Sequence, residues 1–116
     1  MALHHRINYL ELPARELEAT KAFFQAVFGW GFVDYGPDYS CFTQAGIDGG
    51  FFRSSLSFDT LNGSPLLVLY SNDLNASLEA VKAHGGEISK DIFSFPGGRR
   101  FHFRCPSQNE YAVWSE

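Results

Sequence analysis

Hydrophobic and polar residues alternate over short stretches in the first half of the chain, and one longer stretch shows helical spacing instead. Residues 16–28 place Leu17, Phe24 and Phe28 on one side of a helix, and Gly29 supplies its C-terminal cap. Strands are predicted at residues 7–12, 30–35, 39–44 and 47–53. Pro13 is expected to end the first of them. The predicted order of this half is therefore βαβββ.

The second half repeats this order after residues 54–64, which are polar and are expected to act as a linker. A helix is predicted over residues 73–84, and strands at residues 65–70, 87–95, 99–104 and 109–115. A shift of 57 residues places Leu17 on Leu74 and Gly29 on Gly86, which indicates an internal repeat. We therefore expect one domain, residues 1–116, made of two βαβββ modules at about 5–54 and 64–116.

Composition adds one feature to this picture. The hydrophobic share of 45% and the charged share of 19% are typical of a packed domain. The aromatic share is 16%, with 12 phenylalanines, which is more than a simple core of this size is expected to bury. Some rings are therefore expected to line a groove or an interface.

Charge and hydropathy exclude several classes of partner. The net charge is −4 and the basic residues are scattered, which argues against nucleic-acid binding. The apolar runs are shorter than a membrane span, so no membrane partner is expected. The N-terminal residues lack the apolar region of a signal peptide, which favours a cytoplasmic location with Cys41 and Cys105 as reduced thiols.

Local motifs in both halves resemble those of one known superfamily. Residues 9–14 (YLELPA) run into 17–24 (LEATKAFF) and 27–30 (VFGW), and residues 106–110 (PSQNE) form a turn before the last strand. In this order they resemble the vicinal oxygen chelate superfamily of glyoxalases, bleomycin-resistance proteins and extradiol dioxygenases. The resemblance implies an α+β fold in which two βαβββ modules form a cup-shaped, curved mixed sheet around a small-molecule site. It also implies a homodimer.

The resemblance further implies ligand positions for a divalent metal on the first and last strands of the modules. These positions fall on Tyr9, Leu66 and Ala112, while residues 49–52 contain no ligand type. Leucine and alanine side chains cannot bind a metal, so no metal and no other cofactor is expected at the standard site. A site rebuilt from His102 and Glu11 is the alternative.

The other candidate residues are expected to face the cup. His102 lies between Phe101 and Phe103, so alternation places it on the opposite face, which is either part of the cup or simply solvated. Glu11 shares a face with Tyr9, where a desolvated carboxylate could act as a base, anchor a cation or pair with Arg100 or Arg104. The predicted ligand-binding residues are Tyr9, Glu11, Leu66, Arg100, His102, Ala112 and Trp114.

Three functions agree with these residues. The first and favoured one is a homodimeric protein that binds a small organic molecule in an aromatic cup, with Tyr9 and Trp114 stacking on it. The second is an enzyme related to glyoxalases or dioxygenases, with a rebuilt metal site or with metal-free acid–base chemistry by Glu11 or His102. The third is a structural dimerisation domain without a cavity.

Overall fold

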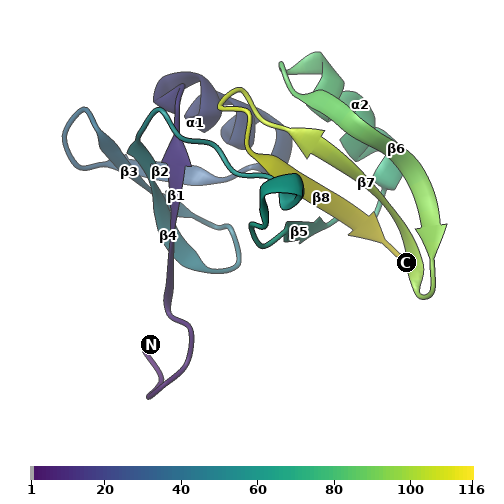
Figure 1. Cartoon of the computed structure of the whole chain (residues 1–116), viewed down its shortest axis with the longest axis horizontal. Helices are drawn as coiled ribbons and strands as arrows, with labels where there is room; N and C mark the ends of the chain where they lie inside the picture. The colour runs from purple at the N-terminus through teal and green to yellow at the C-terminus, as the bar shows by residue number, and fades with distance from the viewer. Residues whose placement is uncertain (1) are drawn as a thin grey trace.

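The elements of the chain follow the predicted order. In a computed structural model that describes residues 2–116, a short 3-10 helix, η1 (Thr60–Asn62), separates two βαβββ modules (Figure 1). The helices begin at Leu17 and Leu74, in keeping with the predicted repeat. The elements are β1 (Tyr9–Ala14), α1 (Leu17–Phe28), β2 (Gly31–Asp34), β3 (Tyr39–Thr43), β4 (Asp48–Arg53), β5 (Leu67–Tyr70), α2 (Leu74–Ala83), β6 (Glu87–Phe95), β7 (Gly98–Arg104) and β8 (Glu110–Ser115).

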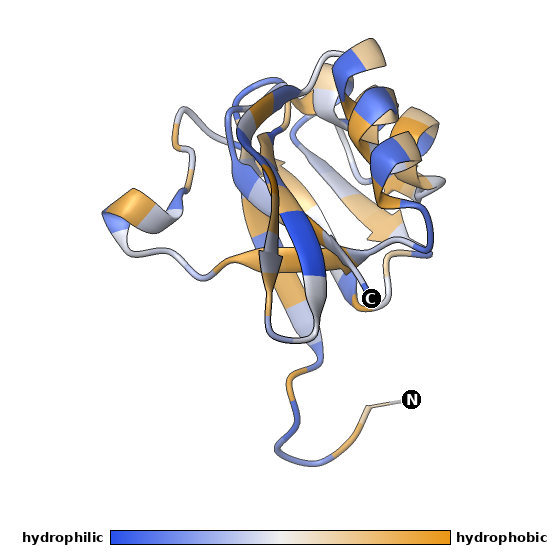
Figure 2. Ribbon diagram, turned by 90° about the vertical axis from the view of Figure 1, so that its right-hand side faces the viewer, coloured by the Kyte–Doolittle hydropathy of each residue, from blue (hydrophilic) through white to orange (hydrophobic). Residues whose placement is uncertain are grey.

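Each module forms its own four-stranded mixed sheet. The strand order is β1-β4-β3-β2 in the first sheet and β5-β8-β7-β6 in the second. The outer pairs β1–β4 and β5–β8 are parallel, and the remaining pairs are antiparallel. Figure 2 shows both helices on one side of the sheets and the connection with η1 on the other side. The predicted α+β fold of two βαβββ modules is confirmed. Within residues 2–116, no helix has the length and apolar character needed to cross a membrane.

Aromatic side chains from both modules meet between the helices and the sheets. The ring of Phe24 on α1 stacks on Trp30, with the centroids 4.4 Å apart, and meets Tyr111 of β8 edge-on at 5.1 Å. Phe23 lies 5.7 Å from Phe103 of β7. Since α1 belongs to the first module and these strands to the second, a shared core joins the two.

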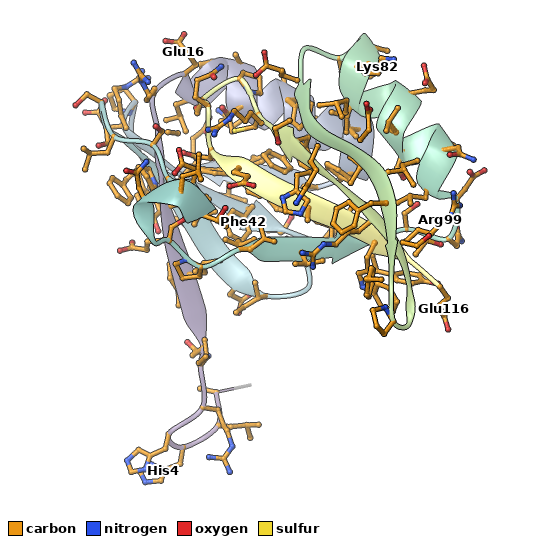
Figure 3. The ribbon with its side chains drawn as sticks, turned by 45° about the vertical axis from the view of Figure 1, so that its right-hand side comes forward. His4, Glu16, Phe42, Lys82, Arg99 and Glu116 are labelled. Atoms are coloured by element: carbon orange, nitrogen blue, oxygen red, sulfur yellow. The ribbon has the colours of Figure 1, made fainter. Side chains whose placement is uncertain are left out.

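Only part of the phenylalanine side chains lie in this core. Six of the twelve are buried in the core: Phe23, Phe24, Phe42, Phe51, Phe101 and Phe103. Phe42 lies near the centre of the view in Figure 3, between the sheets. Phe93 and Phe95 are only half-buried and lie on β6, where both rings contact Arg100. Some rings therefore lie outside the core, as the composition indicates.

The first strand differs from the prediction at Pro13. β1 runs from Tyr9 to Ala14, so Pro13 lies within the strand and does not end it. β1 stands at the edge of its sheet, where a residue without an N–H group is tolerated. The Pro13 carbonyl accepts a hydrogen bond of 2.8 Å from the side chain of Asn109, which ties this edge strand to the second module.

The shared core predicts a large effect of removing Phe24, whose side chain is fully buried. The substitution Phe24→Ala should lower the free energy of unfolding by about 3–5 kcal/mol, because it leaves a cavity between the modules. Urea unfolding measures this loss. Leu61→Ala is the control, since Leu61 is 90% exposed, and it should change the value by about 0.5 kcal/mol or less. Similar losses in both variants would contradict the placement of Phe24 in the shared core.

Candidate functional site

The face of the second sheet that points away from the helices carries most of the predicted site residues. On β7, Phe101 and Phe103 are fully buried toward the helices, so His102 and Arg100 point to the other face. We call this the open face, formed by Val68, Tyr70, Phe93, Phe95, Arg100, His102, Glu110, Ala112 and Trp114. Arg99 and Glu116, labelled in Figure 3, mark the end of this sheet where β7 begins and β8 ends.

His102 and Glu110 form a buried pair on the open face. The Nδ1 atom of His102 lies 2.8 Å from a carboxylate oxygen of Glu110, and the two residues are 6% and 8% exposed. Burial by itself would raise the pKa of Glu110, but hydrogen bonds from His102 and Thr60 outweigh it and hold the pKa below its ordinary value. Glu110 is therefore ionised at neutral pH. Because Nδ1 of His102 is bonded to Glu110, the other ring nitrogen, Nε2, remains buried without a hydrogen-bond partner within residues 2–116.

The connection between the modules supplies the other hydrogen bonds of the Glu110 carboxylate. The backbone N–H and the hydroxyl of Thr60 both donate to the second oxygen of Glu110, at 2.8 and 3.0 Å. The Glu110 N–H donates to the Phe58 carbonyl at 3.0 Å, and Asp59 lies 3.4 Å from the guanidinium of Arg104. The expected linker is thus docked on the second sheet at residues 58–60. The physical reason is that a buried carboxylate needs donors for both oxygens.

Arg100 lies among aromatic rings. Its guanidinium carbon is 5.3 Å from the centroid of Phe93 and 5.6 Å from that of Phe95, within the range of cation–π attraction. Trp114 is its register partner on β8 and lies 6.3 Å from Phe95. The Nε atom of Arg100 is buried without a hydrogen-bond partner, and no ion pair of residues 2–116 includes this side chain.

Two hollows adjoin these side chains. One of about 240 Å³ is lined by Val68, Phe95, Arg100 and Trp114. Another of about 260 Å³ is lined by Thr60, Leu61, Ser89, Lys90, His102, Arg104 and Glu110. A third hollow, of about 230 Å³, has an entirely apolar lining apart from Tyr111, which includes Leu10, Trp30, Phe42 and Leu67. Since a specific site needs polar groups that orient a ligand, the first two hollows are the stronger candidates.

Tyr9 and Glu11 belong to a different group of side chains, on the first sheet. The hydroxyl of Tyr9 lies 2.6 Å from that of Tyr39 and 3.3 Å from the Cys41 sulfur, and Tyr39 donates to Glu11 at 2.8 Å. The Tyr39 ring occupies the space where Gly50 has no side chain. Burial, followed by the hydrogen bonds to Tyr9 and Glu11, raises the pKa of Tyr39 well above its ordinary value, so Tyr39 stays neutral and donates.

The structure corrects three expectations about the predicted residues. Glu11 is exposed and not desolvated, and its partner is Tyr39 instead of an arginine, because it lies on the first sheet. Tyr9 and Trp114, expected to stack on one ligand, lie on different sheets, where Tyr9 is bonded to Tyr39 and Trp114 contacts Tyr70 and Phe95. Leu66 precedes β5, which begins at Leu67, and it is Val68 that faces Ala112 across the sheet.

The positions that the resemblance assigns to a metal do not offer a suitable set of donors. Ala112 is fully buried beside His102, Leu66 is apolar, and Tyr9 is engaged with Tyr39 on the other sheet. In the described part of the chain, no three His, Cys, Asp or Glu side chains lie close enough together to hold an ion. A site rebuilt from Glu11 and His102 is not supported either, since each has its own partners on its own sheet. These residues do not fit a divalent metal.

Several residues of the open face were not predicted. Glu110 has the same alternation as Ala112 and Trp114, so the signal was present in the sequence. Phe93 and Phe95 also alternate, but register shifts in β6 before Phe93 obscure their face. Thr60 lies in a segment without periodicity, so only its contact with Glu110 reveals it.

Comparison with known proteins identifies the fold family. A family model described as the Glyoxalase/Bleomycin resistance protein/Dioxygenase superfamily matches residues 6–113. No curated protein matches the chain.

Solved structures with low sequence identity share this fold. A glyoxalase-related enzyme from Fulvimarina pelagi is 19% identical, with a TM-score of 0.80, over 97% of this chain and 88% of its own. A genomically encoded fosfomycin resistance protein from Listeria monocytogenes is 16% identical, with a TM-score of 0.78, over 98% and 95%. The lactoylglutathione lyase of Agrobacterium tumefaciens is 21% identical, with a TM-score of 0.70, over 96% and 93%.

The buried pair predicts a specific acid sensitivity. The folded-state pKa of Glu110 lies below its ordinary value of 4.5, so its carboxylate stabilises the fold above that pH, and this contribution is lost as the pH falls through the lowered pKa. In Glu110→Gln, the free energy of unfolding should fall less steeply with decreasing pH below about 4.5 than in the wild type. Chemical unfolding at a series of pH values measures both slopes. Glu79→Gln, at an exposed position of α2, should keep the wild-type slope. A wild-type slope in Glu110→Gln would contradict the assignment.

Proposed function

The chain belongs to the Glyoxalase/Bleomycin resistance protein/Dioxygenase superfamily, and from this premise we propose that it binds a small organic molecule non-covalently on its open face. One observation carries the proposal. Two buried polar atoms of the open face, Nε of Arg100 and Nε2 of His102, lack partners within residues 2–116. A buried polar group without a partner destabilises a protein by about 1–3 kcal/mol. A bound molecule that supplies hydrogen-bond partners for both groups would remove this cost.

The neighbouring side chains suit a planar molecule. Trp114, Phe93 and Phe95 surround the Arg100 side chain and offer ring faces for stacking. Ala112, the register partner of His102, is fully buried and lines neither of the two hollows. These features need no metal, and the absence of a metal or other cofactor stays a prediction.

Acid–base catalysis is a second candidate function, favoured by the His102–Glu110 pair. Glu110 accepts the hydrogen bond of Nδ1, so Nε2 is the atom that would exchange a proton with a bound molecule. The two candidates differ in one measurable property. A binding protein releases its ligand unchanged, whereas a catalyst converts it. The hollows at the open face speak against the third alternative, a purely structural domain.

We also propose that a second copy of the chain is a partner. β5 is the outermost strand of the second sheet, and its side chains Val68 and Tyr70 are 46% and 52% exposed. An apolar edge strand is a ready site for association. A dimer through this edge would shelter both side chains and bring the second copy next to the open face.

A ligand screen tests the binding proposal. In thermal denaturation of untagged protein with EDTA present, planar organic compounds should raise the Tm, since ligand at a hundred times its Kd adds about 2.7 kcal/mol of stability. Trp114→Ala should weaken these compounds about tenfold through lost stacking. Tyr35→Ala, which removes an exposed ring, should leave them unchanged. Compounds that bind only with added divalent metal, or equally well to Trp114→Ala, would contradict the proposal.

Light scattering tests the dimer. The mass in solution should be twice the 13.0 kDa of one chain. Val68→Glu should shift the protein toward the monomer, because it places a charge on the free edge of β5. Val33→Glu is the matched control, since Val33 is also exposed and lies on the outermost strand β2 of the other sheet. A monomeric wild type, or the same shift in both variants, would overturn the dimer.

A further inference from the structure

Two basic side chains near the open face lack an ion-pair partner among residues 2–116. The chain carries a net charge of −4, yet Arg100 and Lys90 of this region take part in no ion pair of residues 2–116. The carboxylate of Asp59 is paired with Arg104. Glu110 has one oxygen bonded to His102 and the other to Thr60, so neither is left to neutralise Arg100. Arg100 therefore has no carboxylate partner among residues 2–116, and Glu116 at the end of the same face is instead bonded to Tyr70.

The two unpartnered polar atoms lie on neighbouring positions of one strand face. Arg100 and His102 are two residues apart on β7, which places their Cα atoms about 7 Å apart along the strand. The Nε–H of Arg100 is always a donor. Nε2 of His102 lies beside it as a second buried polar atom without a partner among residues 2–116. Arg100 therefore calls for an acceptor, and a negatively charged acceptor also pairs with the guanidinium.

We propose that the ligand is a small organic carboxylate with a planar apolar body. Its carboxylate accepts hydrogen bonds from the guanidinium of Arg100, and its body lies against Trp114 and Phe95 in the adjoining hollow of about 240 Å³. The inference rests on the proposed function and adds the chemical class of the ligand. An amide of the same shape would leave the charge of Arg100 unbalanced, and an amine would be repelled by Arg100 and Lys90.

The size and lining of the site favour a carboxylate over inorganic phosphate. Three of the four residues that line the 240 Å³ hollow are apolar or aromatic, which contributes nothing to binding a bare anion. The planar guanidinium matches the two oxygens of a carboxylate. Binding should therefore require the anion and the apolar body together.

Matched pairs of acids and amides test the inference. Titrations followed by NMR would compare benzoate with benzamide, 2-naphthoate with 2-naphthamide, and inorganic phosphate alone. Each acid should bind at least about tenfold more tightly than its amide, because a hydrogen-bonded charge pair is worth more than a neutral one. Naphthoate should bind more tightly than benzoate, and phosphate should bind most weakly.

Substitutions on β7 test whether Arg100 causes the preference for acids over amides. Arg100→Gln should lower the affinity for the acids about tenfold and leave the amides nearly unchanged. Arg99→Gln is the control, since Arg99 is the exposed neighbour on the other face of the same strand. Arg100→Lys retains the charge and should keep part of the preference for acids, which guards against a folding defect in the first variant. Circular dichroism would verify that each variant is folded.

The outcomes separate the ligand class from the proposed function. Equal binding of acids and amides would overturn the carboxylate and leave small-molecule binding intact. Phosphate binding as tightly as the organic acids, or equal losses in Arg99→Gln and Arg100→Gln, would also overturn it, since either would indicate a general charge effect. No binding by any organic compound in this panel or in the screen would overturn both proposals.

Discussion

The buried carboxylate of Glu110 is the group around which the second sheet is organised. A carboxylate that is 8% exposed needs compensation for the water it has lost, and it finds three donors on two other segments. His102 supplies one donor from β7, and Thr60 supplies two from the connection between the modules. The connection is therefore held against the sheet, and the imidazole is fixed with its Nε2 atom free. The same pairing that anchors the chain thus leaves the open face with an unused polar group.

The alternation of side chains along the strands places some aromatic rings in the core and others on the open face. Phe101 and Phe103 face the helices and complete a core that α1 shares with both sheets. Arg100 precedes Phe101 on the same strand and points to the other face, where Phe93 and Phe95 flank its guanidinium. The core stabilises the pairing of the modules, and this rigid support keeps the charged side chains of the open face in place.

Membership of the superfamily explains the architecture and leaves the chemistry to the side chains. Relatives with 16–21% identity superpose over nearly the whole chain, which shows that the same fold tolerates very different residues. In this chain, the positions that the family resemblance assigns to metal ligands are tyrosine, leucine and alanine. The groups with unmet polar atoms are instead an arginine and a histidine two residues apart on β7.

The sequence by itself determined the order of the elements, the repeat and the face that His102 occupies. These features depend on local periodicity, because a helix or a strand repeats its side-chain direction within a few residues. Tertiary structure alone decided that Tyr9 and Glu11 belong to one sheet while Arg100, His102 and Trp114 belong to the other. It also decided that Pro13 continues an edge strand and that Thr60 meets Glu110 across 50 residues of chain. Such contacts depend on strand pairing and on the partners a buried group requires, and neither has a signature in the neighbouring residues.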